Sequence, residues 1–85
     1  MRFKVEFDPN AIRFLRRQCD EATRRLFYEQ LERMKEDPLS NSQSFSDRKT
    51  SRYMLRLFPF GGFVAIFAFD PSHDMIRVME CRLPK

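Results

Sequence analysis

Arginine side chains are the groups in this sequence best suited to bind a phosphate. Arg52 and Arg56 alternate with apolar residues in the stretch 51–58, and Arg82 ends the stretch 75–82. The planar guanidinium can hold two phosphate oxygens at once and keeps its proton at any ordinary pH. Because an exposed strand face carries such residues in any case, the pattern alone leaves two alternatives open, a phosphate site and a solvated surface.

Five further arginines fall in the part of the chain where helices are expected: Arg13, Arg16, Arg17, Arg24 and Arg25. Their spacing directs most of them away from the apolar helix faces, which is typical of solvated side chains. The alternative is contact with RNA phosphates, which holds a protein on a nucleic acid without reading its sequence.

The remaining candidates for chemistry carry weaker signals. His73, the only histidine, lies among Asp, Pro and Ser residues, a composition typical of a turn. Cys19 and Cys81 have neither metal-ligand nor CxxC spacing, so two partly buried free thiols are expected. No zinc, Walker or dinucleotide-binding motif is found in the sequence. We therefore expect no metal and no cofactor.

Length and charge narrow the class of protein. The chain has 85 residues and a formal net charge of +4, which predicts a single domain over residues 1–85 and an acidic partner such as nucleic acid or an acidic protein segment. No apolar run approaches the roughly 18 residues of a membrane span, and charged residues interrupt the first 20 positions. These features predict a cytoplasmic protein without a membrane segment.

Local patterns predict the order of the elements. A strand at 2–7 is expected to pass through Asp8 and Pro9 into a helix at 9–18, and Asp20 to begin a second helix that ends before Pro38. A polar loop is expected at 38–50, followed by strands at 51–58, 63–69 and 75–82. This order predicts an α+β fold: an N-terminal strand, a helical hairpin and a three-stranded antiparallel meander.

Hydrophobic periodicity predicts which faces are buried. The strand at 2–7 should direct Phe3, Val5 and Phe7 toward the core. The two helices should direct these residues toward the core: Ile12, Leu15, Cys19, Leu26, Phe27, Leu31 and Met34. In the strand at 51–58, we expect Tyr53, Leu55 and Leu57 to face the helices. Arg52, Met54, Arg56 and Phe58 should then lie on the uncovered face of the sheet.

With these elements placed, the sequence resembles the RelE/ParE toxin superfamily. The resemblance covers essentially the whole chain and rests on the order of four short motifs: FKVEFDPNA at 3–11, YMLR at 53–56, GFVAIF at 62–67 and Arg82 in the last strand. It implies the β-α-α-β-β-β fold of that superfamily and the role of a toxin in a bacterial type II toxin–antitoxin system.

The RelE-like members imply a particular reaction. They cut mRNA on the ribosome without a metal: the 2′-hydroxyl of the RNA attacks the adjacent phosphate, and basic residues on the uncovered sheet face stabilise the developing charge. Carried over by position, Arg56 matches the arginine of the Tyr-x-Leu-Arg motif, Arg52 stands where one family lysine would lie, and Arg82 matches the basic residue of the last strand. These three are the predicted catalytic residues.

Three positions depart from the RelE-like pattern. Met54 stands where a second lysine is expected, Val64 replaces the arginine of the central strand, and the sequence ends at Lys85 before any C-terminal tyrosine. The alternatives to a ribosome-dependent mRNA endoribonuclease are a ParE-like toxin that poisons DNA gyrase and a degenerate toxin that only binds. Each implies a cognate antitoxin as partner, whose acidic or amphipathic segment should cover a basic sheet face.

Overall fold

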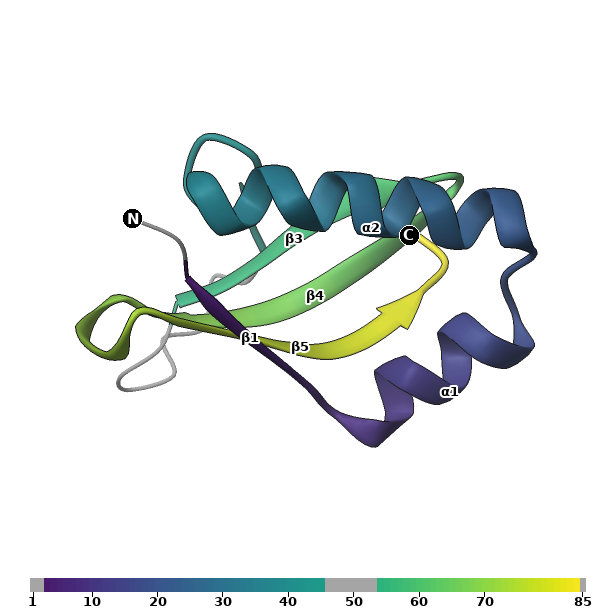
Figure 1. Cartoon of the computed structure of the whole chain (residues 1–85), viewed down its shortest axis with the longest axis horizontal. Coiled ribbons are helices and arrows are strands. Elements are labelled where there is room, and N and C mark those ends of the chain that lie inside the picture. Colours follow the sequence, from purple (N-terminus) through teal and green to yellow (C-terminus); the bar gives the residue numbers. More distant parts are fainter. Residues whose placement is uncertain (1–2, 46–53, 85) are drawn as a thin grey trace.

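A computed structural model describes residues 3–45 and 54–84 and confirms the predicted α+β order (Figure 1). The elements are β1 (Lys4–Phe7), α1 (Pro9–Arg17), α2 (Glu21–Glu36), β2 (Gln43–Ser44), β3 (Met54–Phe60), β4 (Phe63–Asp70), the short 3-10 helix Pro71–His73 and β5 (Met75–Arg82). The two-residue strand β2, which lies within the predicted loop, was not expected from the sequence. No helix in the described ranges is both long and apolar enough to span a bilayer.

The strands form one mixed sheet in the order β1-β5-β4-β3-β2. β3, β4 and β5 are the predicted antiparallel meander, and β1 adds to it by pairing in parallel with β5, with Glu6 opposite Arg77. The first and last strands of the chain are therefore neighbours, which brings side chains from both chain ends to the same part of the sheet.

The two helices begin where the sequence predicts. The side chain of Asp8 accepts a hydrogen bond from the backbone N–H of Asn10 at 2.9 Å, and Asp20 accepts one from Thr23 at 2.8 Å. These carboxylates satisfy N–H groups that have no partner within the helix and also suit its positive N-terminal end. Both predicted N-caps are confirmed.

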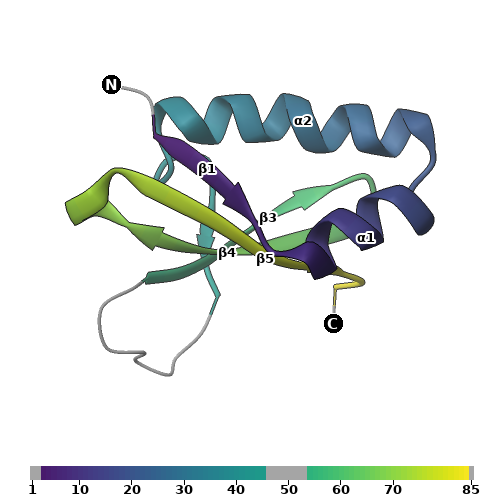
Figure 2. The same cartoon turned by 60° about the horizontal axis from the view of Figure 1, so that its bottom comes forward.

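Both helices pack on one face of the sheet, where the core lies (Figure 2). Phe27 of α2 is fully buried, and its ring contacts those of Phe7, Phe58 and Phe60. Leu15, Cys19, Leu31 and Met34 are buried as predicted.

Two predicted core residues are wrong. Ile12 is 38% exposed and Leu26 is 47% exposed. On α1, Ala11 is buried and Phe14 packs against the core, so the helix presents a slightly different face from the one expected. The sequence could not fix this rotation, because apolar residues stand on both sides of the true contact face.

The predicted faces of β3 are reversed. Phe58 and Phe60 are buried in the core, and Arg56 lies opposite the core residue Phe67. Directly opposite residues of an antiparallel pair share a face, so Arg56 lies on the helix side. Alternation has a period of two and apolar residues occur at both parities of this strand, so the pattern alone could not choose the face. Tyr53 lies outside the described residues.

An irregularity in β5 changes which of its side chains share a face. Ile66 pairs with Glu80, whereas the next residue, Phe67, pairs with Val78, so Met79 is the extra residue of a β-bulge. Arg77 and Glu80 therefore both lie on the face without helices, although a regular pleat would place them on opposite faces.

Candidate functional site

We call the face of the sheet opposite the helices the open face. Cross-strand pairing of β3, β4 and β5 places three rows of side chains on it, with one residue from each strand in a row. The rows are Leu55–Ala68–Arg77, Leu57–Ile66–Glu80 and Pro59–Val64–Arg82. Arginines from β5 therefore stand at both ends of this face.

Arg82 lies on the open face, where the resemblance predicts a phosphate-binding residue. The Cζ atom of Arg82 lies 5.3 Å from the ring centre of Phe45, so the two side chains approach each other over the intervening strands. Nη1 of Arg82 is 3.8 Å from Glu80, and the side chain remains 39% exposed. A guanidinium held against an aromatic ring and still open to solvent can bind an anion in a fixed orientation.

Arg56 is instead bound to the segment that follows α2. Its Nε donates to Ser42 Oγ at 2.6 Å, and its Nη2 donates to the carbonyl oxygens of Ser42 at 2.8 Å and Leu39 at 3.3 Å. Nη1 also lies 3.5 Å from Ser44 Oγ. The guanidinium fork is thus occupied by protein oxygens, and Arg56 does not share a face with Arg82. Arg52 lies outside the described residues.

A third arginine, Arg77, was not among the predicted site residues. Its Nη1 lies 3.2 Å from Glu6 and its Nη2 lies 3.7 Å from Asp8. The signal is non-local, because Glu6 meets Arg77 only through the parallel pairing of β1 with β5. Two carboxylates therefore oppose the charge of this arginine.

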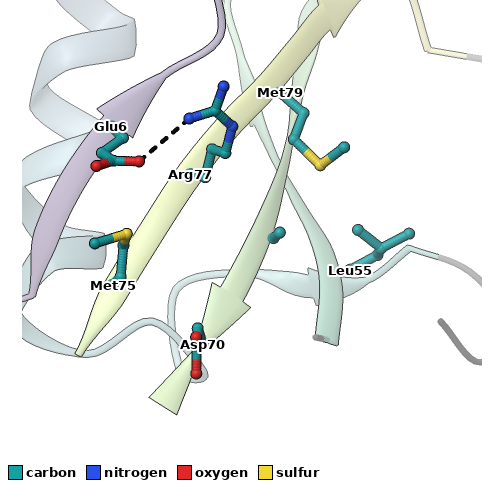
Figure 3. Close-up of a pocket in the computed structure, with 7 residues that line it drawn as sticks. Glu6, Leu55, Asp70, Met75, Arg77 and Met79 are labelled. Carbon is teal, nitrogen blue, oxygen red and sulfur yellow. Dashed lines mark hydrogen bonds and ion pairs between the residues drawn. The ribbon is translucent and has the colours of Figure 1, made fainter. Parts of the chain in front are cut away.

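A pocket of about 420 Å³ opens on the open face beside Arg77 (Figure 3). Its apolar lining comes from Leu55, Ala68, Met75 and Met79. Figure 3 shows Glu6 and Arg77 directed toward each other on one side of it, and Asp70 at one end. The pocket thus combines an apolar interior with three charged groups at its border.

Asp70 belongs to a compact turn and not to a catalytic triad. Ser72 donates to Asp70 through its N–H at 3.1 Å and through its hydroxyl at 2.7 Å, and His73 Nδ1 lies 2.7 Å from the same carboxylate. These hydrogen bonds, those of Ser72 first, lower the pKa of Asp70 below its ordinary value. Ser72 Oγ also lies 3.1 Å from His73 Nδ1, but both side chains bind the Asp70 carboxylate. The Ser72 hydroxyl donates to Asp70, and His73 is not placed to take its proton as the base of a triad does.

The helix arginines fall into two groups. Arg24 donates to the carbonyl oxygens of Leu15 at 3.2 Å and Cys19 at 2.6 Å, and so satisfies backbone groups at the end of α1. Arg13, Arg16 and Arg17 are exposed on α1 and border two shallow hollows, while Arg25 is exposed on α2, 3.9 Å from Glu21. Arg24 therefore has a structural contact, whereas the α1 arginines face solvent.

No three His, Cys, Asp or Glu side chains in residues 3–45 and 54–84 come together in a way that could hold a metal ion. Cys19 and Cys81 are buried and free. Burial raises the pKa of the Cys81 thiol to about 12, and it also raises the pKa of Cys19. Both groups are thiols at neutral pH, a form that is a poor nucleophile and a poor metal ligand.

Comparison with known proteins identifies the fold. No protein-family model matches the sequence, and no curated protein matches it. A chain of the RelE–RelB complex from Pyrococcus horikoshii superposes with a TM-score of 0.82 at 15% identity, over 98% of this chain and 96% of that one. A chain of the intact E. coli RelBE toxin–antitoxin complex gives 0.71 at 14% identity, with 98% of both chains covered.

The isolated E. coli RelE toxin gives a TM-score of 0.72 at 13% identity, over 98% of this chain and 85% of that one. The chain therefore has the RelE fold, and the resemblance read from its short motifs extends to the arrangement of the whole described structure.

Proposed function

We propose that this protein is the toxin of a toxin–antitoxin pair and that it cleaves mRNA on the ribosome. The observation that carries the proposal is the RelE fold, shared over 98% of the chain with an isolated toxin and with chains of two toxin–antitoxin complexes. The predicted cognate antitoxin follows from the same comparison, because two of these relatives are complexes with RelB.

In the proposed reaction, the 2′-hydroxyl of the mRNA attacks the adjacent phosphate and the 5′-oxygen leaves. Negative charge grows on the phosphate oxygens, so a fixed cation stabilises the transition state more than the ground state. Arg82 supplies that cation, since it lies exposed on the open face against Phe45. Arg52 is assigned the same role on its sequence position alone.

Arg56 has a different part in this proposal, because its fork already holds the backbone of Leu39 and Ser42. It acts as a positioning residue for the segment that leads through β2 to Phe45, the residue against which Arg82 lies. Its loss should weaken cleavage through misplacement of Phe45 and Arg82, and not through loss of a phosphate contact.

The exposed arginines of α1 are the best candidates for contact with ribosomal RNA. Arg13, Arg16 and Arg17 lie on one nine-residue helix. Contacts of this kind go to phosphates and weaken steeply as salt rises. Arg25 on α2 is assigned to the same group, whereas Arg24 contributes less because it is bound to backbone oxygens.

A second candidate is a toxin that acts by binding alone, as a gyrase poison or as a degenerate member without catalysis. One observation favours it: Val64, opposite Arg82 on the open face, replaces the arginine that RelE-like enzymes carry in the central strand. Without that cation, and with Arg77 already paired to Glu6 and Asp8, fewer charges are left on this face to stabilise a phosphate.

The test is induced expression in a bacterium, with growth followed while the 5′ ends of cellular mRNA are mapped. We expect growth arrest with new cuts inside translated frames, lost in Arg82→Ala and kept in the matched control Arg33→Ala, an exposed arginine of α2 outside the site. Arrest without cuts would move the assignment to the binding toxin, to be tested with purified gyrase. Normal growth of cells that contain the folded protein would contradict a toxin.

A further inference from the structure

The open-face pocket has an interior suited to an apolar side chain. Leu55 and Ala68 are cross-strand partners, and Met75 and Met79 extend the lining along β5 (Figure 3). Its volume of about 420 Å³ is within the range of roughly 300–1,000 Å³ found for ligand pockets. The pocket is thus large enough to enclose part of a partner molecule.

Met79 makes this interior adaptable. It is the extra residue of the bulge in β5, is 40% exposed and lines the pocket. A thioether on an unbranched chain can change its conformation at little cost and so accommodate aliphatic groups of several shapes. The bulge therefore aims a flexible apolar group at the position where a ligand would sit.

The border of the pocket is acidic on balance. Its carboxylates are Glu6 and Asp70, and its one cation, Arg77, is already bound by Glu6 and by Asp8 outside the pocket. Asp70 accepts a hydrogen bond from Ser72 and lies 2.7 Å from His73, and as a carboxylate it is charged at neutral pH. An RNA phosphate here would be repelled, whereas a lysine or arginine would be attracted.

We propose that this pocket receives an aliphatic side chain of a partner polypeptide, with a lysine or arginine beside it that reaches Glu6 and Asp70. The inference rests on the proposed function in so far as this polypeptide is the antitoxin. The proposal implies that the partner carries basic residues where it meets the pocket and acidic residues where it meets the exposed arginines of α1. The sequence led us to expect an acidic antitoxin segment over a basic sheet face. At this pocket we propose instead that the bound segment carries a basic residue.

The test follows methionine methyl groups of the full chain by NMR after 13C-methyl labelling. The probes are blocked Lys-Leu-Lys-Leu-Lys, its counterpart Glu-Leu-Glu-Leu-Glu and a five-nucleotide single-stranded RNA. We expect the lysine peptide to shift Met75 and Met79 but not the fully buried Met34. The glutamate peptide should bind about fivefold or more weakly, because its charges face carboxylates of the same sign.

Variants separate the two parts of the pocket. Glu6→Gln and Asp70→Asn should weaken binding of the lysine peptide and reduce the difference in affinity between the lysine and glutamate peptides. Ala68→Leu should abolish binding of both peptides, because the larger side chain fills the interior of the pocket. Leu83→Gln is the control, because Leu83 is exposed and does not line the pocket. It should leave the affinity of both peptides unchanged. Equal binding of the two peptides, shifts with RNA alone, or no shift with either peptide would each overturn the proposal.

This outcome is independent of toxicity. A chain that arrests growth but leaves Met75 and Met79 unshifted with both peptides would keep the proposed function and reject the pocket. A harmless chain that binds the lysine peptide at these methionines would do the reverse.

Discussion

At the scale of single residues, Arg56 shows how one side chain can be read in two ways. In the sequence it is an arginine in a strand motif, whereas in the structure it binds Ser42 and the carbonyl oxygen of Leu39. A cation that holds backbone carbonyls contributes to stability, because its removal leaves those groups without a partner. The sequence indicated an arginine able to bind oxygen atoms, but the oxygens that it binds belong to a segment 12 to 17 positions earlier in the chain. Contacts between such distant residues could not be inferred from the sequence.

We predict that Arg56→Ala lowers the free energy of unfolding by about 1.5–3 kcal/mol, the usual range for hydrogen bonds made by a charged group. Urea unfolding followed by circular dichroism measures the change. Arg82→Ala, whose partners are an exposed carboxylate and a ring, should change the midpoint much less. An Arg56→Ala protein as stable as the wild type would contradict the positioning role.

Cys81 allows a second test at this scale. Burial raises its pKa to about 12, so the folded protein keeps this thiol protonated at pH 8, and we expect almost no reaction with a disulfide reagent such as DTNB until urea unfolds the chain. The unfolded thiol titrates near the ordinary value of 9.0. Between pH 9 and 12 the unfolded state therefore binds fewer protons, and the free energy of unfolding should fall as pH rises.

The reaction is followed at 412 nm with native and unfolded protein, and Cys81→Ala separates this thiol from Cys19. Rapid stoichiometric modification of the native protein at pH 8 would show that β5 opens more readily than its burial indicates.

At the scale of elements, the predictable features are those that depend on neighbours in the chain. Asp8 with Pro9 and Asp20 with Glu21 begin helices, and both starts are confirmed because capping needs only a carboxylate two or three residues from a free N–H. The hairpin between β3 and β4 follows from Gly61 and Gly62, whose φ angles of +54° and +90° most side chains avoid.

The unpredicted features depend on distant parts of the chain. β2 has two residues, too few for a periodic signal, and exists because it pairs with Leu57 and Arg56 of β3. On α1, the ring of Phe14 packs against Phe63 of β4, and in β3 the rings of Phe58 and Phe60 pack against Phe27 of α2. Local periodicity could not predict these contacts, because they join residues that are distant in the sequence. The carboxylates at the border of the pocket were not predicted for the same reason, since Glu6 and Asp70 come to line one pocket only in the folded sheet.

The N-cap of α2 gives a prediction with a defined pH dependence. Hydrogen bonds from Thr23 lower the pKa of Asp20, so the native state holds this carboxylate in its charged form more strongly than the unfolded state does. The resulting stabilisation is complete above the ordinary value of 3.8 and is lost as pH falls through the lowered folded value.

We therefore expect Asp20→Ala to have a lower urea midpoint than the wild type at pH 7. The difference between the two midpoints should become smaller as the pH falls below 3.8. Asp20→Asn should keep the cap, because asparagine also accepts from the helix N–H groups, but should lose the acid dependence that belongs to this residue. A wild-type and an Asp20→Asn protein with the same slope of stability against pH below 4 would argue against the lowered pKa.

At the scale of the whole molecule, charge is divided between two regions. The exposed arginines Arg13, Arg16 and Arg17 lie on α1, whereas Glu6 and Asp8 pair with Arg77, and Asp70 lines the same pocket as Glu6 and Arg77. A formal net charge of +4 conceals this division. The expectation of a basic open face came from the charge and the resemblance, and did not include the carboxylates beside Arg77. The proposed function uses the α1 arginines and Arg82 at one end of the open face, and the proposed pocket lies beside Arg77 at the other end. A single partner can therefore contact both ends, or each end can bind its own partner.

The core, in contrast, is a single unit that depends on one aromatic side chain. Phe27 of α2 is fully buried and contacts rings from β1 and β3, namely those of Phe7, Phe58 and Phe60. In a chain of 85 residues, the whole stability is expected to be about 5–15 kcal/mol, with small domains at the lower end. Replacing a buried Phe by Ala typically costs about 3–5 kcal/mol through lost contacts and the cavity left behind.

We predict that Phe27→Ala removes most of the stability, so that the protein is largely unfolded at 37 °C and loses helix and sheet in one transition. The neighbour Leu26 is 47% exposed, and Leu26→Ala is the matched control, which should keep a nearly unchanged thermal midpoint. Thermal unfolding followed by far-UV and near-UV circular dichroism makes the measurement. If Phe27→Ala lost the α2 signal while the sheet remained cooperative and folded, the helices and sheet would be separate units, and binding to the open face would not require the helical layer.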